Sequence, residues 1–438
     1  MTRLRIRAAV IGLLFIGSAA ISGLSLIGTD ADVAADRLES AASSRPPSDA
    51  RLFVANTTGE LSDGLDDAGD YALVGLAELQ QARETADPSH YARADEALSR
   101  ALEIDPDNIE ALIGQGTLAL ARHDFAGALE VGERALSLND SIARVYGVVA
   151  DAQVELGRYD EALATVQQMV DLRPDLGSLS RVSYLRELHG DLPGAIEAME
   201  LALDAGGPTT ENTEYVRVQL GNLFLAVGDV EAAEGAFTTS LARLPGFVPA
   251  TAGLARVRAA QGRLSEAIDL YRDATERIPL PELVVALGET YEAAGRADDA
   301  RDQYALAEAM QALFEANGVQ TDLELAAFFD DHGDPERAAT LARDAYARTP
   351  SVRAADILGW ALFKAGEVEK AARHADEALR LGWRDARVLF HAGLIAEAAG
   401  HPDIAGDRLA AALDLNPRFS PLYAPMAVEA IARLEDDR

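Results

Sequence analysis

An alanine that recurs at nearly constant intervals constrains the fold of this 438-residue chain more than any other feature of its sequence. Successive occurrences are separated by 33 or 34 residues, apart from two steps of 38 residues. Seven residues after each one comes a second position, which is alanine in eight of ten cases. Two helical turns separate the two positions, so both lie on one face of a helix. The recurring residues are Ala94, Ala128, Ala162, Ala195, Ala233, Ala267, Ala300, Ala338, Ala371 and Ala405.

Glycine and proline mark where the helices of each repeat end. Five residues before the alanine, eight of ten repeats have a glycine, which readily adopts the left-handed conformation that follows a helix. Twelve residues after the alanine, six of ten repeats have a proline, which ends a second helix. Each repeat therefore predicts a helix, a tight turn and a second helix. The glycines are Gly157, Gly190, Gly228, Gly262, Gly295, Gly333, Gly366 and Gly400.

The first two repeats depart from this pattern at the turn. Asp87, Pro88 and Ser89 replace the glycine turn of the first repeat, where we expect helices over residues 70–85 and 90–104. His123 occupies the glycine position of the second repeat.

The core that these repeats predict is built from small and aliphatic side chains, because only 6% of the residues are aromatic. Small residues on both helices allow the backbones to approach closely, and larger side chains fill the remaining gap. We expect Leu220 and Phe224 to pack against Phe237, and Leu287 and Tyr291 to pack against Tyr304. One helix pair cannot bury its apolar face alone, so neighbouring pairs must stack into one continuous core.

The succession of small residue, aromatic residue, glycine turn, alanine, aromatic residue, alanine and proline resembles the tetratricopeptide repeat, most clearly over residues 214–247, 248–280 and 281–314. The resemblance extends over residues 70–418. It implies an all-α fold, a right-handed α-solenoid of about ten helix–turn–helix units. It also implies that the first helices line a concave groove that binds peptides or partner helices.

Both longer steps have a local interpretation. The extra residues before Ala233 fall in a Gly- and Pro-containing segment, residues 206–210, which we expect to be a surface loop. Those before Ala338 lengthen a second helix by about one turn, and Asn317 and Gly318 end that helix. Residues 419–438 are expected to form a capping helix over about 421–435, with Ser420 as its N-cap.

The N-terminal region predicts export or membrane attachment. Arg3, Arg5 and Arg7 precede an uncharged apolar run over residues 8–28, which as a helix would span about 31 Å. Residues 1–28 are therefore a transmembrane anchor or a cleaved signal peptide, with a buried helix as the third interpretation. The first two predict a repeat body outside the cytoplasm, either attached to the cell membrane or secreted or periplasmic. Residues 29–69 read as an acidic flexible linker with a short helix within it.

Charge and composition exclude several classes of function. A formal charge of −33 disfavours nucleic-acid binding, which depends on neutralising phosphates. The absence of cysteine excludes thiol catalysis and thiolate metal sites. No phosphate-binding loop or catalytic motif is found, so we expect no enzymatic activity, cofactor or metal. His332 after Asp330 and Asp331 suggests either a metal site or a polar turn.

The groove predicted by the resemblance is the remaining place for a function. Its first helices carry hydrogen-bonding, charged and aromatic residues, a mixture that favours recognition. The alternative for Trp360 and Phe363 is packing against the next unit, and no lysine-rich clamp for a peptide terminus is visible. The candidate peptide-binding residues are Tyr184, Asn222, Arg256, Glu289, Glu292, Trp360 and Phe363.

The sequence therefore predicts a non-enzymatic scaffold outside the cytoplasm that binds a protein or peptide of basic or neutral character, in envelope complex assembly or export. We expect it to attach to the membrane through residues 8–28, unless that segment is a cleaved signal peptide, and to bind no nucleic acid. A self-assembling structural protein and, less strongly, a small-ligand or metal-dependent enzyme are the alternatives. The oligomeric state stays open.

Overall fold

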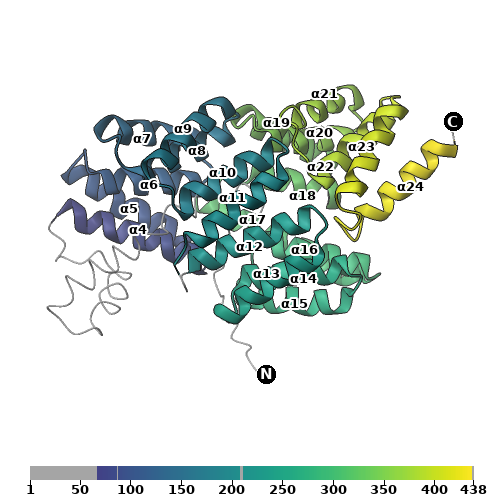
Figure 1. Ribbon diagram of the computed structural model, residues 1–438, viewed down its shortest axis with the longest axis horizontal. Helices are drawn as coiled ribbons and strands as arrows, with labels where there is room; N and C mark the ends of the chain where they lie inside the picture. The colour runs from purple at the N-terminus through teal and green to yellow at the C-terminus, as the bar shows by residue number, and fades with distance from the viewer. Residues whose placement is uncertain (1–66, 86, 208–210, 437–438) are drawn as a thin grey trace, which may run out of the picture.

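The computed structural model describes residues 67–85, 87–207 and 211–436, and within these residues it contains 21 helices and no β-strand (Figure 1). Ten consecutive helix pairs are followed by one further helix. The first helices of the pairs are α4 (Ala68–Thr85), α6 (Ile109–Ala121), α8 (Ala143–Glu155), α10 (Leu176–Leu188), α12 (Glu211–Ala226), α14 (Val248–Ala260), α16 (Pro281–Ala293), α18 (Asp322–His332), α20 (Val352–Lys364) and α22 (Ala386–Ala398).

The second helices pack against the first within each pair and lead to the next pair. They are α5 (Ser89–Ile104), α7 (Phe125–Leu138), α9 (Tyr159–Leu172), α11 (Leu192–Asp204), α13 (Val230–Arg243), α15 (Leu264–Arg277), α17 (Ala297–Ala316), α19 (Pro335–Arg348), α21 (Val368–Ala378) and α23 (Pro402–Leu415). The final helix is α24 (Tyr423–Asp436). The expected all-α solenoid is confirmed.

The recurring alanines lie at the helix contacts, as their spacing predicts. All ten are at most 2% exposed, and the residues seven positions later are at most 3% exposed. Phe237 illustrates why the opposing positions are small. A Cβ atom added at Gly221 or at Gly253 would lie 2.6 Å or 2.4 Å from its ring, too close for any side chain.

The turns between paired helices follow the glycine prediction with one exception. Seven of the eight glycines have φ between 71° and 82°, and His123 adopts the same left-handed conformation with φ of 59°. The prediction is wrong for Gly333, which ends α18 with φ of −152° and ψ of −121°, outside the left-handed region.

The spiral of helix pairs is wound so tightly that its first turn contacts its second. Backbone and side chains from the turns of early pairs bind segments 191 to 197 residues later. The Tyr159 hydroxyl accepts a hydrogen bond from the Val352 amide (2.8 Å), and the Asn416 side chain donates one to the Leu225 carbonyl (2.7 Å). In Figure 1 the α8–α9 region accordingly lies beside α19 and α20.

Apolar packing also crosses between these two turns of the spiral. One continuous cluster of buried residues joins Tyr159 and Tyr184 of the first turn to Val352, Trp383 and Val388 of the second. The inner wall is therefore not an open groove along its whole length, because the second turn covers part of it.

Both 38-residue steps contribute to this closure. Helix α17 has 20 residues, against 14 in α15, which confirms the expected longer helix. Its extra length carries Phe314, which is fully buried and packs in one cluster with Ala72 and Leu79 of α4. At the other step, Asn212 at the start of α12 accepts a hydrogen bond from Arg83 of α4 (2.6 Å). Of the predicted loop at 206–210, residues 208–210 lie outside the described residues.

The C-terminal helix is present close to its predicted position. The Ser420 hydroxyl accepts hydrogen bonds from the amides of Leu422 and Tyr423, both at 3.2 Å. The helix starts at Tyr423, so Pro421 precedes it instead of occupying its first position.

None of the helices in the described part of the chain is long and apolar enough to cross a membrane. The anchor or signal predicted at residues 1–28 lies outside the described residues, as does nearly all of the predicted linker at 29–69.

Candidate binding cavity

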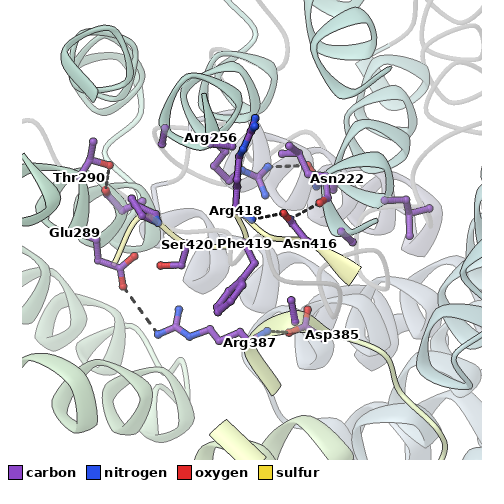
Figure 2. A pocket seen from close by; sticks show the side chains of 18 of the residues that line it. Asn222, Arg256, Glu289, Thr290, Asp385, Arg387, Asn416, Arg418, Phe419 and Ser420 are labelled. Carbon is purple, nitrogen blue, oxygen red and sulfur yellow. Dashed lines mark hydrogen bonds and ion pairs between the residues drawn. The ribbon is translucent and has the colours of Figure 1, made fainter. Parts of the chain in front are cut away.

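A cavity of about 360 Å³ lies between the two turns of the spiral. Residues of α12, α14 and α16 form one side of it, and residues 385–387 and 416–421 from the end of the array form the other (Figure 2). Helix packing within each turn and the contacts between turns together fix its walls.

Arg256 is the central cation of this cavity. It lies on α14, and its Nη2 atom donates a hydrogen bond to Oδ1 of Asn222 on α12 (2.7 Å). Asn222 in turn donates to Oε1 of Gln219 (3.0 Å), which fixes the orientation of the amide. Burial lowers the pKa of the Arg256 guanidinium, since desolvation disfavours its charged form. Within the described residues Arg256 forms no ion pair with a carboxylate.

The opposite side of the cavity contributes a second cation, Arg418. Its backbone amide donates to Oδ1 of Asn416 (2.9 Å), so the same asparagine that holds the two turns together also fixes this loop. Figure 2 shows the Arg418 side chain extending away from the loop at the cavity, and this side chain is exposed to solvent.

The acidic residues of the cavity already have partners. Glu289 lies 3.4 Å from Nε2 of His332 and 4.0 Å from the guanidinium of Arg387. Asp385 is the N-cap of α22 and accepts hydrogen bonds from the amides of Arg387 (2.8 Å) and Val388 (3.0 Å). Glu187 also lines the cavity and is engaged in an interaction as well.

Next to the cavity, Asp331 organises a buried polar cluster. It accepts hydrogen bonds from Nε1 of Trp360 (2.9 Å) and from Arg387 (2.6 Å). Burial alone would raise the pKa of Asp331, but the charges of Arg387 and His391 outweigh it and lower this pKa to about 2. Asp331 is thus a stable anion that holds Arg387 at the cavity wall.

Sequence models of the tetratricopeptide repeat (TPR) match this chain. One matches residues 79–141, 218–280 and 325–386, and a second matches residues 119–187. Together the matched segments cover more than half of the chain. The chain belongs to the tetratricopeptide repeat family.

Several solved structures are similar to this one. A thermophilic TPR protein of Thermus thermophilus is 20% identical over 41% of this chain and 92% of its own, with a TM-score of 0.36. A TPR protein of Parabacteroides merdae is 17% identical over 56% of this chain and 97% of its own, with a TM-score of 0.41. Human IFIT1, solved as a dimer with PPP-AAAA, is 15% identical over 92% of this chain and 91% of its own, with a TM-score of 0.46. No curated protein is significantly similar in sequence.

The cavity of this TPR array brings together three of the seven candidate residues, Asn222, Arg256 and Glu289. The other four lie elsewhere. Tyr184 is only 5% exposed, within the apolar contact between turns. Glu292 accepts a hydrogen bond from the Tyr304 hydroxyl (2.9 Å) on the neighbouring helix.

Trp360 and Phe363 pack against each other and the next TPR unit. Trp360 is 3% exposed, and its ring stacks on His391 of α22 with 4.3 Å between centroids. The ring of Phe363 lies 5.1 Å from that of Trp360. Packing was the alternative interpretation of both residues, and the structure agrees with it, since a buried indole is not available to a ligand.

His332 belongs to the TPR core instead of a metal site. Its ring stacks on Tyr304 with 4.0 Å between centroids and points its Nε2 atom at Glu289. In the described segments, no group of three or more His, Asp or Glu side chains is arranged to hold a metal ion.

The repeat pattern did not reveal the opposite wall of the cavity. Asp385, Arg387 and Arg418 come from the second turn of the spiral, far along the chain from the residues they face: Arg387 lies 98 residues after Glu289, and Arg418 lies 196 residues after Asn222. Arg418 also lies beyond the last repeat. A periodic sequence gives no signal for which turns of the spiral meet, so these residues could not be grouped with Arg256.

Proposed function

We propose that this protein is a non-enzymatic TPR scaffold that binds a protein or peptide partner, with the cavity between the turns as its primary contact. TPR proteins generally act as protein-interaction scaffolds. The observation that supports the proposal most is that Asn222, Arg256 and Glu289, on three successive first helices, line one preformed cavity. A preformed site lowers the entropic cost of binding.

The size of the cavity limits what it receives. A volume of about 360 Å³ is near the lower end of the range for ligand pockets in proteins. It accommodates one or two side chains or the end of a chain, but not a whole helix. We infer that a partner inserts a short segment here and makes its other contacts on the surrounding surface.

The location of the protein belongs to the same proposal. The basic residues before an apolar run at 8–28 support a repeat body outside the cytoplasm, tethered to the membrane or released after cleavage. A role in assembling or exporting envelope components follows from such a location. Fusion of a reporter to the C-terminus, followed by fractionation, tests it: a reporter accessible only from the cytoplasm would exclude this location.

Site-specific crosslinking tests the binding site. A photoreactive amino acid placed at Ser420, at the cavity, should crosslink a partner that the same probe at Arg272 on the outer helix α15 does not. The captured protein is then purified and its affinity for the full-length chain is measured directly. Equal crosslinking from both positions, or no measurable affinity of the purified protein, would contradict the proposal.

Self-assembly is supported by a separate observation at the end of the array. Met426 and Val428 of α24 are 45% and 56% exposed, so the terminal helix presents apolar side chains to solvent. Stacking of array ends predicts a molar mass that grows with concentration in light scattering and returns to that of a monomer in a Val428→Glu variant. A constant monomer mass would reject this alternative.

A further inference from the structure

We propose that the contact between the two turns of the spiral is a pH-sensitive latch, which holds the walls of the cavity together in mild acid and lets them separate in mild base. The latch consists of Glu155 and His123 from the first turn and Glu324 and Arg353 from the second. Its effect on a partner rests on the proposed function, whereas the separation of the turns does not.

The two turns of the spiral meet backbone to backbone. The turn inside each of four successive helix pairs contacts the segment that follows the pair five units later. The Gln320 amide donates a hydrogen bond to the Arg122 carbonyl (3.0 Å), and a Cβ atom added at Gly157 would lie 2.5 Å from the Pro350 carbonyl oxygen. A contact this close leaves little room for water, so a charge buried in it needs a counter-charge from the protein. The facing residues are His123 and Gln320, Gly157 and Pro350, Gly190 and Gly382, and Gly228 and Leu415.

This contact continues into the cavity. The Asn416 side chain donates a hydrogen bond to the Leu225 carbonyl (2.7 Å), and the two residues line the cavity from opposite turns. The same row of contacts therefore holds the walls of the cavity in place, and a change in the contact between turns changes the cavity.

Two glutamates from opposite turns are buried in the contact. Glu155 is the last residue of α8 and is 5% exposed, and Glu324 lies in the first turn of α18 and is 7% exposed. Within the described residues, the Oε2 atom of Glu324 accepts no hydrogen bond. Burial raises the pKa of Glu155, the charges of Arg353 and His123 lower it, and the charge of Glu324 raises it further. The two carboxylates thus repel each other across the contact.

His123 is the cation of the latch that can lose its charge. Its Nδ1 atom lies 2.9 Å from the Gln320 carbonyl oxygen and 3.7 Å from Oε2 of Glu324. Because a carbonyl only accepts, Nδ1 carries a hydrogen in both protonation states, and deprotonation changes only the charge beside Glu324. Histidine is the side chain whose charge ordinarily changes between pH 5 and 8. The neighbouring Arg122 is already paired with Asp95 (2.7 Å).

The charge balance of the latch depends on this proton. The other groups that face Glu155 are Tyr184 and Tyr159, and burial raises the pKa of both phenols, so they stay neutral. Arginine stays charged over the whole range. With a proton on His123, two cations balance two carboxylates; without it, only Arg353 opposes them. The negative charge left in the contact is costly to bury.

Both titrations favour separation of the turns as pH rises. Because the closed contact raises the pKa of Glu155, the closed state binds more protons there, and its stability falls as pH rises above the ordinary value of 4.5. Loss of the His123 proton removes an attraction to Glu324 and acts in the same direction. The closed state is therefore favoured in mild acid.

A distance measurement across the contact tests the latch in the full-length chain. Since the chain has no cysteine, spin labels attach only at Gln168→Cys of α9 and Ala347→Cys of α19, both exposed positions. Double electron–electron resonance should give one short distance at about pH 5.5 and an additional, longer distance at about pH 8.5. Identical distance distributions at the two pH values would overturn the inference.

Three variants assign the response to the latch. Glu324→Gln keeps the shape of the side chain and removes its charge, so the longer-distance fraction in mild base should fall at least about threefold. His123→Gly, with the residue that seven other turns have in the same conformation, should show the longer distance already in mild acid. The exposed Glu161→Gln of α9 should respond like the unsubstituted protein. A pH response of Glu324→Gln equal to that of the unsubstituted protein would overturn the inference.

The affinity of the crosslinked partner distinguishes the latch from the proposed function. We expect the partner to bind at least about threefold more tightly in mild acid than in mild base, and with less pH dependence to Glu324→Gln. If the distances change with pH and the affinity does not, control of binding is overturned and the scaffold function stands. If the distances change but no partner is captured at Ser420, the scaffold function fails and the pH-dependent separation stands.

Discussion

Asp330 on α18 shows how a single residue can oppose the stability of this fold. It is 4% exposed, and its Oδ1 atom accepts no hydrogen bond within the described residues. Burial, and then the negative charges of Asp331 and Asp356, raise its pKa well above the usual value, although Arg387 and Lys364 act in the opposite direction. The folded protein therefore holds this proton at a pH where the unfolded chain has released it.

The sign of the resulting pH dependence follows directly. Because the folded state binds more protons at Asp330, the free energy of unfolding falls as pH rises above about 4. Asp330→Asn removes this pH-dependent loss of stability. We therefore expect the variant to be more stable than the wild type near pH 7 by roughly 1–3 kcal/mol. The advantage should shrink toward pH 4. Chemical denaturation over this range, with the exposed Asp302→Asn on α17 as control, checks it. An advantage that is constant with pH would contradict the assignment.

Two glycines of neighbouring helices give a matched test of helix approach. An added Cβ atom at Gly253 would lie 2.4 Å from the Phe237 ring, whereas one at Gly235 of α13 would meet no atom within 4 Å. Gly253→Ala should therefore destabilise the protein by about 1–3 kcal/mol. Gly235→Ala should stabilise it by up to about 1 kcal/mol, since alanine favours a helix. Thermal unfolding of both variants measures the difference, and equal effects would show that α14 does not need this close approach.

At the scale of the elements, the longer helix α17 connects distant repeats. Phe314 is fully buried against α4, while its neighbour Leu313 is 36% exposed. We expect Phe314→Ala to cost about 3–5 kcal/mol and Leu313→Ala much less. Hydrogen exchange gives the sharper readout, because Phe314→Ala should reduce the protection of amides in α4, more than 200 residues earlier in the chain. Loss of protection confined to α17 and its sequence neighbours would refute the contact.

The helices were largely predictable from sequence because their signals are local. The recurring alanines gave ten helix pairs, and the helices expected at 70–85 and 90–104 are α4 (Ala68–Thr85) and α5 (Ser89–Ile104). Gly333 was the exception, since a glycine permits a left-handed turn but does not require one. Only one wall of the candidate cavity was predictable from the sequence. Asn222, Arg256 and Glu289 share a repeat position, but Arg418 lies opposite them only because of how the spiral winds.

At the scale of the whole molecule, hydrogen bonds and apolar contacts hold one turn of the spiral against the other. Replacing Tyr159 by Phe and Asn416 by Ala removes the hydrogen bonds to the Val352 amide and the Leu225 carbonyl. We expect the double variant to lose roughly 2–4 kcal/mol, and its radius of gyration in small-angle scattering to increase as the turns separate. Ser137→Ala, which removes an exposed hydrogen bond within α7, is the control. If the double variant loses the expected stability but keeps the radius of gyration of the wild type, the turns do not separate.

The contacts that join residues separated by 191 to 197 positions in the sequence also change how such an array should unfold. In a linear stack each unit touches only its neighbours, so units melt progressively from the ends and stability grows with their number. Here the interior units of one half are stabilised by the other half, and deleting a terminal unit removes support from a unit far along the chain. The protein should behave as a single cooperative block, and shortening it from either end should cause an abrupt loss of structure in place of a gradual one.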